Sequence, residues 1–450
     1  ALVGYTEHGF VVQNSWGEDW GFGGFALLPY EDYLLHATDV WVMQLGVPLR
    51  ADLWAQGNTE TTAGLQRAQA VISLEKIRPY MVDIGNNGEL STSGDYWNTE
   101  SDVERLFTNV VLEQTKTWKK RRVLLYLHGG LNSERSVAQR ILAFRDVLLE
   151  NEIYPIHLMW ETGVVETLNG LLHDYLSTED SRAAGVSDWL RKLREGLYEA
   201  KDRTLELTLA RPGTVLWGEM KQNAQFASDH PNPDKQGAME LIAQYAGQAL
   251  TTLDAAAFEA LEVHVVAHSA GSIFTAHAIK HLSGLGPAFK SLQFLAPALR
   301  VDEFRKFLLP YIKKGSCPRP RLYVLSDAGE RDDNVGPYGR SLLYLVSNAF
   351  EGRRETPLLG MQRFLQTLPD GSQGEVDTDV TTLFNGNDGG VPRLVIAGKN
   401  YAPSGSDPLF FSQSNSHGGF DNDPVTLNTV LKQILGHEPT RPFGVRDLQY

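Results

Sequence analysis

Apolar runs of strand length recur along most of this chain, and helical patterns follow several of them. The run "RRVLLYLHGG" (121–130) precedes "SVAQRILAFRDVLLE" (136–150), which places Val137, Ile141 and Phe144 on one helical face. Further runs are "YPIHLMW" (154–160), "LEVHVVAHSAG" (261–271), "SLQFLAPA" (291–298), "RLYVLSDA" (321–328) and "RLVIAG" (393–398). This alternation predicts an α/β fold, a mostly parallel sheet with helices on both faces.

The same patterning divides the chain. Residues 1–45 are rich in glycine and aromatic side chains and predict two or three short β-strands. The stretch 46–78 loses this pattern, and its polar "QGNTETTAG" is typical of a linker. We expect the α/β body over 79–438, with a helical insertion at 161–255, and a tail at 439–450.

Composition narrows the classes of function. The chain has 450 residues, is 42% apolar and carries a net charge of −14, so it can form a sizeable core but lacks the basic face that nucleic acid requires. Its one cysteine, Cys317, cannot form an internal disulfide. The sequence shows neither an apolar run of membrane length nor a signal peptide, and we therefore expect no membrane span and a cytoplasmic protein.

Candidate chemistry begins at "VVAHSAGS" (265–272), where an apolar strand gives way to a helical pattern. A serine at such a junction, with small residues two before and two after it, matches a nucleophile elbow. Here Ser269 is the serine, and Ala267 and Gly271 must be small so that strand and helix can approach. The competing interpretation is a plain turn in which Ser269 only caps the helix.

The loop "LYLHGGLN" (125–132) follows an earlier strand. Backbone N–H groups of such a loop, with that of the residue after the nucleophile, can bind a tetrahedral oxyanion. These groups would come from Gly130 or Leu131, together with Ala270. The alternative is a glycine turn that merely closes a βα unit.

A general base should follow the last strand. Of the two late histidines, His417 in "SQSNSHGGFDNDP" lies between the last strand and the last helix, whereas His437 lies in the tail. The acid should end a late strand, and Asp327 in "RLYVLSDA" is the first choice. The alternatives are three other carboxylates near late strands: Asp302, Asp332 and Asp333.

In this order and context the motifs of residues 79–438 resemble the α/β-hydrolase superfamily, of esterase or lipase type. The resemblance implies a triad in which Ser269 attacks a carbonyl, His417 moves the proton and Asp327 orients the imidazole. It implies no metal and no cofactor. Acidic stretches such as "GFDNDP" (419–424) lack the ligand spacing of a calcium loop, and Asp423 before Pro424 instead predicts a helix N-terminus.

The segment "NSWGEDWGFGGFALL" (14–28) resembles the C-terminal part of the papain-like cysteine peptidases. Asn14 matches the residue that orients the catalytic histidine there, and Trp16 matches its shield. The histidine and cysteine of that family would precede Ala1, so residues 1–41 carry one third of a triad. We expect a longer parent protein and no thiol proteolysis by this chain alone.

Together these features predict a serine hydrolase that acts on carboxylic esters, acyl lipids among them. The insertion would form a lid, and four of its apolar residues would suit an acyl-binding wall, although core packing explains them equally well. These residues are Leu216, Trp217, Met220 and Phe226. The alternative is that the body is a non-catalytic docking module of a larger papain-like peptidase. In both cases the upstream papain-like domain is a possible contact.

Overall fold

A computed structural model describes residues 2–6, 8–13, 20–22, 24–36, 72–92, 94–130, 133–160, 189–336 and 338–449, with only the backbone of 189–201. The chain separates into two compact units, Ala1–Asp52 and Leu53–Tyr450. The predicted sites at Asn14, Trp16 and Leu131 lie outside the described residues.

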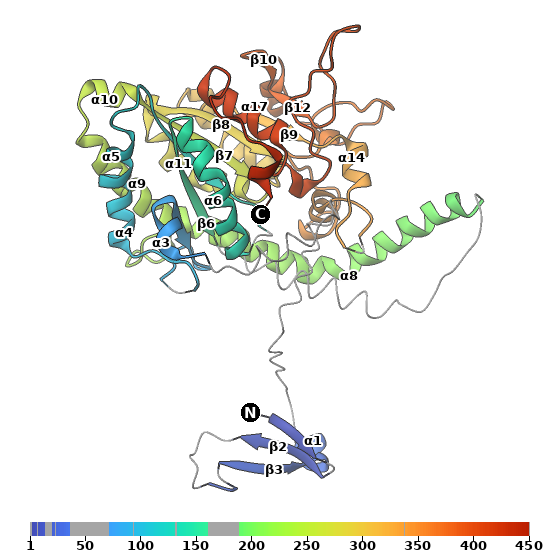
Figure 1. Cartoon of the computed structure of the whole chain (residues 1–450). Helices are drawn as coiled ribbons and strands as arrows, with labels where there is room; N and C mark the ends of the chain where they lie inside the picture. Colours follow the sequence, from blue (N-terminus) through green and yellow to red (C-terminus); the bar gives the residue numbers. More distant parts are fainter. Residues whose placement is uncertain are drawn as a thin grey trace. The chain divides into compact units, whose positions relative to one another are not determined.

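The larger unit is built on a seven-stranded parallel sheet (Figure 1), which confirms the predicted α/β class. Its strand order is β12-β9-β8-β7-β5-β6-β4. The strands are β4 (Met81–Ile84), β5 (Arg121–Leu127), β6 (Ile153–Trp160), β7 (Leu261–His268), β8 (Phe289–Leu295), β9 (Arg321–Val324) and β12 (Leu394–Ile396). The sequence patterns predict six of them. They miss β4, because Asp83 interrupts its four-residue apolar run.

The strand order reverses between β5 and β7. After β5 the chain adds β6 on one side, and after β7 it adds β8, β9 and β12 on the other. Loops that leave the carboxyl ends of two such strands diverge, and in open α/β sheets this crevice is where ligands bind. The loop 128–130 and the turn at Ser269 both leave the sheet at this point.

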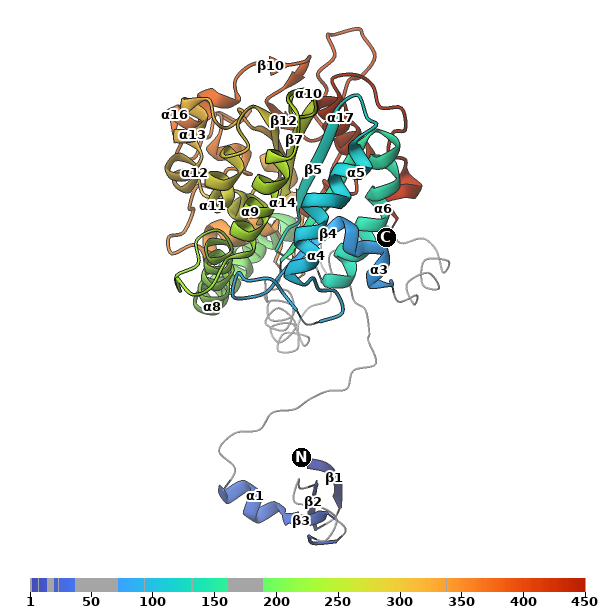
Figure 2. The ribbon, with the colours of Figure 1, turned by 90° about the vertical axis from the view of Figure 1, so that its left-hand side faces the viewer.

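Helices cover both faces of the sheet (Figure 2). The helices of this unit are α3 (Leu74–Ile77), α4 (Glu100–Arg105), α5 (Val111–Thr115), α6 (Glu134–Glu150), α8 (Trp189–Ser228), α9 (Ala238–Thr251), α10 (Ala255–Ala260), α11 (Gly271–Ser283), α12 (Val301–Phe307), α13 (Leu309–Lys314), α14 (Asp327–Asp332), α15 (Leu342–Leu345), α16 (Thr378–Thr381) and α17 (Pro424–Leu435).

Side-chain contacts assign the helices to faces. Tyr126 of β5 meets Phe144 of α6, and the amide of Gln293 in β8 donates to the Val430 carbonyl of α17. Strands β5, β7 and β8 pair so that Tyr126, Val266 and Gln293 are in register, which puts α6 and α17 on the same face. Trp160 of β6 points the other way and packs edge-on against Phe274 of α11.

The insertion contributes packing rather than an open wall in its described part. Trp217 and Met220 of α8 are 2% and 0% exposed and belong to the main core. The Trp217 indole also donates to Glu351. Their burial agrees with the core-packing interpretation for these two residues, and an acyl-binding role stays a prediction. Among the described helices none is long and apolar enough to cross a bilayer.

The packed body reaches beyond the predicted boundaries of 79 and 438. Helix α3 lies within the segment expected to be a linker, and Ile77 is fully buried. At the other end Phe443 and Leu448 join the core, and the Asn151 amide donates to the Arg441 carbonyl. Apolar burial thus holds both ends of the described part of this unit, residues 72–449.

The N-terminal unit contains a three-stranded antiparallel sheet in the order β1-β2-β3. Its elements are β1 (Leu2–Thr6), β2 (Gly9–Gln13), β3 (Phe25–Pro29) and α1 (Tyr30–His36). Phe10 packs edge-on against Tyr30 and Tyr33, which ties the helix to the sheet. The predicted strands are therefore present.

Candidate active site

Ser269 occupies a strained turn between β7 and α11. Its φ is +49°, in the left-handed region that residues with a side chain rarely adopt. The neighbouring backbone holds it there: the Ser269 N–H donates to the Leu295 carbonyl at 2.9 Å, and the Ser272 hydroxyl donates to the Ser269 carbonyl at 2.6 Å. The N-cap of α11 is Ala270. The structure thus favours the elbow over the interpretation of Ser269 as a helix cap.

Gly271 permits this turn. A Cβ atom at Gly271 would lie 2.5 Å from the Leu127 carbonyl oxygen and 3.0 Å from that of His128. Both are backbone atoms of β5 and the loop after it, so no side chain can rotate away. The expectation that Gly271 must be small is confirmed. The close approach also brings the turn after Ser269 against the loop that begins at His128.

His417 lies directly beside the serine. It begins a three-residue 3₁₀ turn (His417–Gly419) in the loop before α17, and its Nε2 is 2.8 Å from the Ser269 hydroxyl oxygen. Both side chains are buried. Burial lowers the pKa of His417 to about 3, so the imidazole is neutral near pH 7 and can accept the serine proton. His437, by contrast, is exposed.

The other ring nitrogen of this imidazole, Nδ1, needs a hydrogen-bond acceptor. If Nε2 accepts from Ser269, then Nδ1 carries the ring proton, yet Nδ1 is buried and has no hydrogen-bond partner among the residues that the structure describes. Asp333 is the carboxylate that contacts this residue, and its Oδ2 accepts from the His417 backbone N–H at 2.8 Å. Burial raises the pKa of Asp333 above its usual range. The loop that carries Asp327, Asp332 and Asp333 therefore contacts His417 through Asp333.

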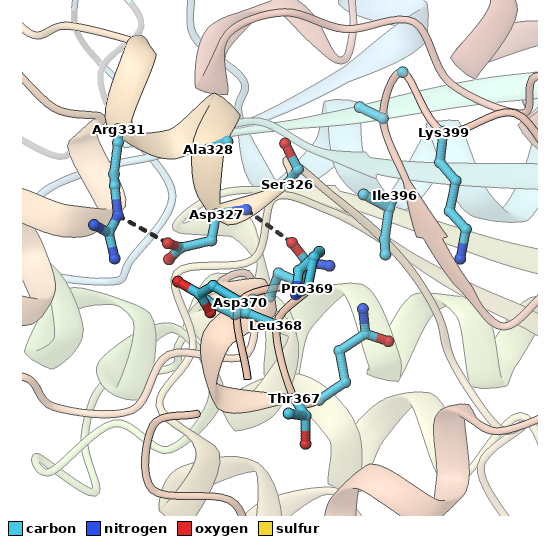
Figure 3. A pocket seen from close by; sticks show the side chains of 14 residues that line it. Ser326, Asp327, Ala328, Arg331, Thr367, Leu368, Pro369, Asp370, Ile396 and Lys399 are labelled. Carbon is cyan, nitrogen blue, oxygen red and sulfur yellow. Dashed lines mark hydrogen bonds and ion pairs between the residues drawn. The ribbon is translucent and has the colours of Figure 1, made fainter. Parts of the chain in front are cut away.

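Asp327, the first choice from sequence, is engaged elsewhere. Its carboxylate accepts from the Tyr344 hydroxyl at 2.7 Å. It also pairs with Arg331 at 2.8 Å (Figure 3). Ser326 caps α14, so Asp327 belongs to the first helical turn and its side chain points to Tyr344 and Arg331. No described contact joins it to His417. As the partner of His417, the prediction of Asp327 does not agree with this structure.

Asp327 instead lines a separate cavity of about 770 Å³ between the ends of β9 and β12, together with Ile396 and Lys399 (Figure 3). The two remaining carboxylate candidates, Asp302 and Asp332, make no contact with His417 in the described part of the structure. Asp302 pairs with Arg300, and Asp332 is exposed.

The proposed oxyanion loop is held by His128. Its Nδ1 lies 2.7 Å from the Gly129 carbonyl, and its Nε2 accepts from the Trp160 N–H at 3.2 Å. Since a carbonyl only accepts, Nδ1 carries the proton and the ring is neutral, in agreement with a pKa lowered to about 3 by burial. Gly130 and Ala270 follow the adjacent strands β5 and β7 at one edge of the sheet.

Sequence reasoning missed a buried polar cluster beside this pair. His268 places its Nε2 2.9 Å from the His417 carbonyl. Its Nδ1 is 3.4 Å from Asp421, which also pairs with Arg140 at 3.0 Å and accepts from Tyr126 at 2.9 Å. Two features of the sequence could have indicated this cluster: His268 directly precedes Ser269, and Asp421 follows His417 by four residues.

The described residues contain no group of three or more His, Cys, Asp or Glu side chains suited to a metal ion. Comparisons with family models, curated proteins and solved structures found no match for this chain. The geometry of the site is therefore the basis on which a function can be inferred.

Proposed function

We propose that this protein is a serine hydrolase that cleaves carboxylic esters through a covalent acyl-enzyme. One observation carries the proposal: the 2.8 Å contact between the Ser269 hydroxyl and Nε2 of the neutral His417 imidazole. Ser269 lies there in a left-handed turn at the carboxyl end of β7. A serine is a weak nucleophile until an adjacent base takes its proton, and this contact supplies the base.

The chemistry proceeds in two halves. The Ser269 oxygen bonds to the ester carbonyl carbon while its proton moves to His417 Nε2, and the carbonyl oxygen becomes an oxyanion facing the N–H groups of Ala270 and Gly130. Collapse expels the alcohol, which takes the proton from His417. His417 then takes a proton from water as the water oxygen attacks the carbonyl carbon of the acyl-enzyme. His417 returns that proton to the Ser269 oxygen as the bond to the acyl group breaks, which releases the acid and restores Ser269.

We assign the acid of the triad to Asp333. Its carboxylate already touches the backbone of His417, and the buried Nδ1 of the same residue needs an acceptor. An unsatisfied buried donor costs about 1–3 kcal/mol, which favours a rotation of the Asp333 side chain toward Nδ1 when substrate binds. The chain order is then Ser269, Asp333 and His417, as the α/β-hydrolase resemblance of this body implies.

The test is active-site labelling with an alkyl fluorophosphonate and turnover of p-nitrophenyl butyrate. Ser269→Ala should lose labelling and about 10⁴-fold or more in turnover, because nucleophile and base act as a unit. Ser404→Ala is the matched control, since Ser404 is an exposed loop serine and should change neither signal. A panel of p-nitrophenyl esters from acetate to palmitate then separates short-chain esters from acyl lipids.

A folded wild-type protein that neither reacts with the probe nor turns over any ester would refute the proposal. That result would support the alternative, a docking module attached to a papain-like peptidase. The papain-like interpretation of residues 1–41 stays a prediction, and recovery of the upstream coding sequence would test it.

A further inference from the structure

The base is clamped through its own backbone. The His417 N–H donates to Asp333, and the His417 carbonyl accepts from the ring of His268. His417 lies in a loop where Gly418 and Gly419 follow it, and glycines restrict the backbone least. The side chains of Asp333 and His268 therefore restrain a backbone segment that its own glycines restrain little.

His268 is suited to this task by its place in the sheet. It is the last residue of β7, directly before Ser269, and its side chain points to the face covered by α6 and α17. A carbonyl oxygen can only accept, so the 2.9 Å contact requires a proton on Nε2 of His268. Strand β7, which ends directly before Ser269, thus also carries the side chain that donates to the His417 carbonyl.

Asp421 lies beside the other ring nitrogen of His268. Its Oδ2 is 3.4 Å from Nδ1 of His268, 3.0 Å from Arg140 of α6 and 2.9 Å from the Tyr126 hydroxyl of β5. These side chains are all nine-tenths or more buried. Asp421 follows His417 by four residues, so the same short segment is attached to the body at His417 and again at Asp421.

We propose that His268 and Asp421 are positioning residues for the base: Asp421 orients the His268 ring, and His268 holds the His417 carbonyl so that Nε2 stays within reach of Ser269. This inference rests on the proposed hydrolase function. Neither residue touches the reacting atoms, and each acts only through His417. A misplacement of about 1 Å at a catalytic group can cost on the order of 100-fold in rate, which sets the scale of the effect.

The experiment exploits the shapes of two amides. His268→Gln can place an amide N–H where Nε2 lies, whereas His268→Asn is one methylene shorter and cannot reach the His417 carbonyl. His268→Asn should lower kcat for p-nitrophenyl butyrate by roughly 10- to 100-fold with little change in KM, and His268→Gln should recover most of that loss. Asp421→Asn keeps the shape and should resemble His268→Asn, because it removes the charge that orients the ring.

His264→Asn is the matched control. His264 lies on the same strand and face, is buried, and contacts Ser291 rather than His417. It should lower the melting temperature without lowering kcat at temperatures where the variant is folded. A purely structural role for His268 would give this same result and would make the Gln and Asn variants alike.

The outcomes separate the two proposals. An active Ser269→Ala variant would refute the hydrolase proposal itself. Loss of activity in Ser269→Ala together with unchanged kcat in folded His268→Asn would refute only the positioning role. If Asp421→Asn fails to fold, the comparison of His268→Gln with His268→Asn still decides the question.

Discussion

Gly271→Ala is the sharpest test of how the fold holds the site. The added Cβ would lie 2.5 Å from the Leu127 carbonyl oxygen, 2.9 Å from its carbonyl carbon and 3.0 Å from the His128 carbonyl oxygen. Carbon atoms prefer separations of about 3.5–4.0 Å from their neighbours. The methyl group therefore requires α11 to move away from β5 by on the order of 1 Å.

The magnitude follows from which atoms must move. Overpacking a core usually costs about 1–3 kcal/mol, and we expect the upper end here because all three contacts are with backbone. The shift also carries Ser269 away from His417, and their 2.8 Å hydrogen bond has little slack. A displacement of about 1 Å should lower kcat by roughly 100-fold, beyond any loss through unfolding.

The assay combines urea denaturation with ester turnover at a temperature where the variant is folded. Gly218→Ala is the control, since Gly218 is exposed in α8 and a Cβ there would meet no described atom within 4 Å. That change should keep activity and add up to about 1 kcal/mol, the usual difference between glycine and alanine in a helix. A Gly271→Ala protein as stable and as active as wild type would refute the close approach of β5 and α11.

Three further predictions follow. Asp333→Asn should lower kcat by about 10²-fold or more and Asp327→Asn should not, because of these two carboxylates Asp333 is the one with a described contact to His417; a larger loss in Asp327→Asn would reverse this assignment. Burial raises the pKa of Glu330 to about 8, so the folded state keeps a proton that the unfolded chain loses above pH ~4.3, and folding stability falls as pH rises toward 8. Glu330→Gln should therefore stabilise by roughly 1–3 kcal/mol at pH 8 and by little at pH 4, and identical pH profiles of denaturation for both proteins would contradict this. Cys317 is 3% exposed and burial raises its pKa to about 12, so iodoacetamide should modify it only after unfolding, and rapid labelling of the native protein would contradict its placement.

The sequence predicted the parts of the fold that depend on local pattern. Apolar runs located six of the seven strands, and the amphipathic spacing of residues 136–150 located α6, which is Glu134–Glu150. Asp423 before Pro424 marked the start of α17, where the Asp423 side chain accepts from two backbone N–H groups. Such signals act over a few residues, so a single chain carries them in full.

The choice of acid could not be made in the same way. Asp327, Asp332 and Asp333 lie within seven residues, and all three follow β9. Their directions depend on where α14 begins: its cap at Ser326 turns Asp327 toward Tyr344, and the helix ends at Asp332, so Asp333 leaves it toward the His417 loop. Its position at a strand end favoured Asp327. The start and end of α14 instead direct Asp333 to His417.

The polar cluster around Asp421 lay further from sequence reasoning, for a topological reason. Its members come from β5, α6, β7 and the segment before α17, up to 295 residues apart, and no spacing rule connects them. A buried carboxylate is costly unless it is paired, so each of these residues depends on the others to be tolerated in the core. A structural core does not require such a group, since replacing a buried ion pair by well-packed apolar side chains of similar volume is often neutral or stabilising. The presence of four polar side chains beside Ser269 and His417 thus fits the proposed positioning of the His417 backbone better than a contribution to folding alone.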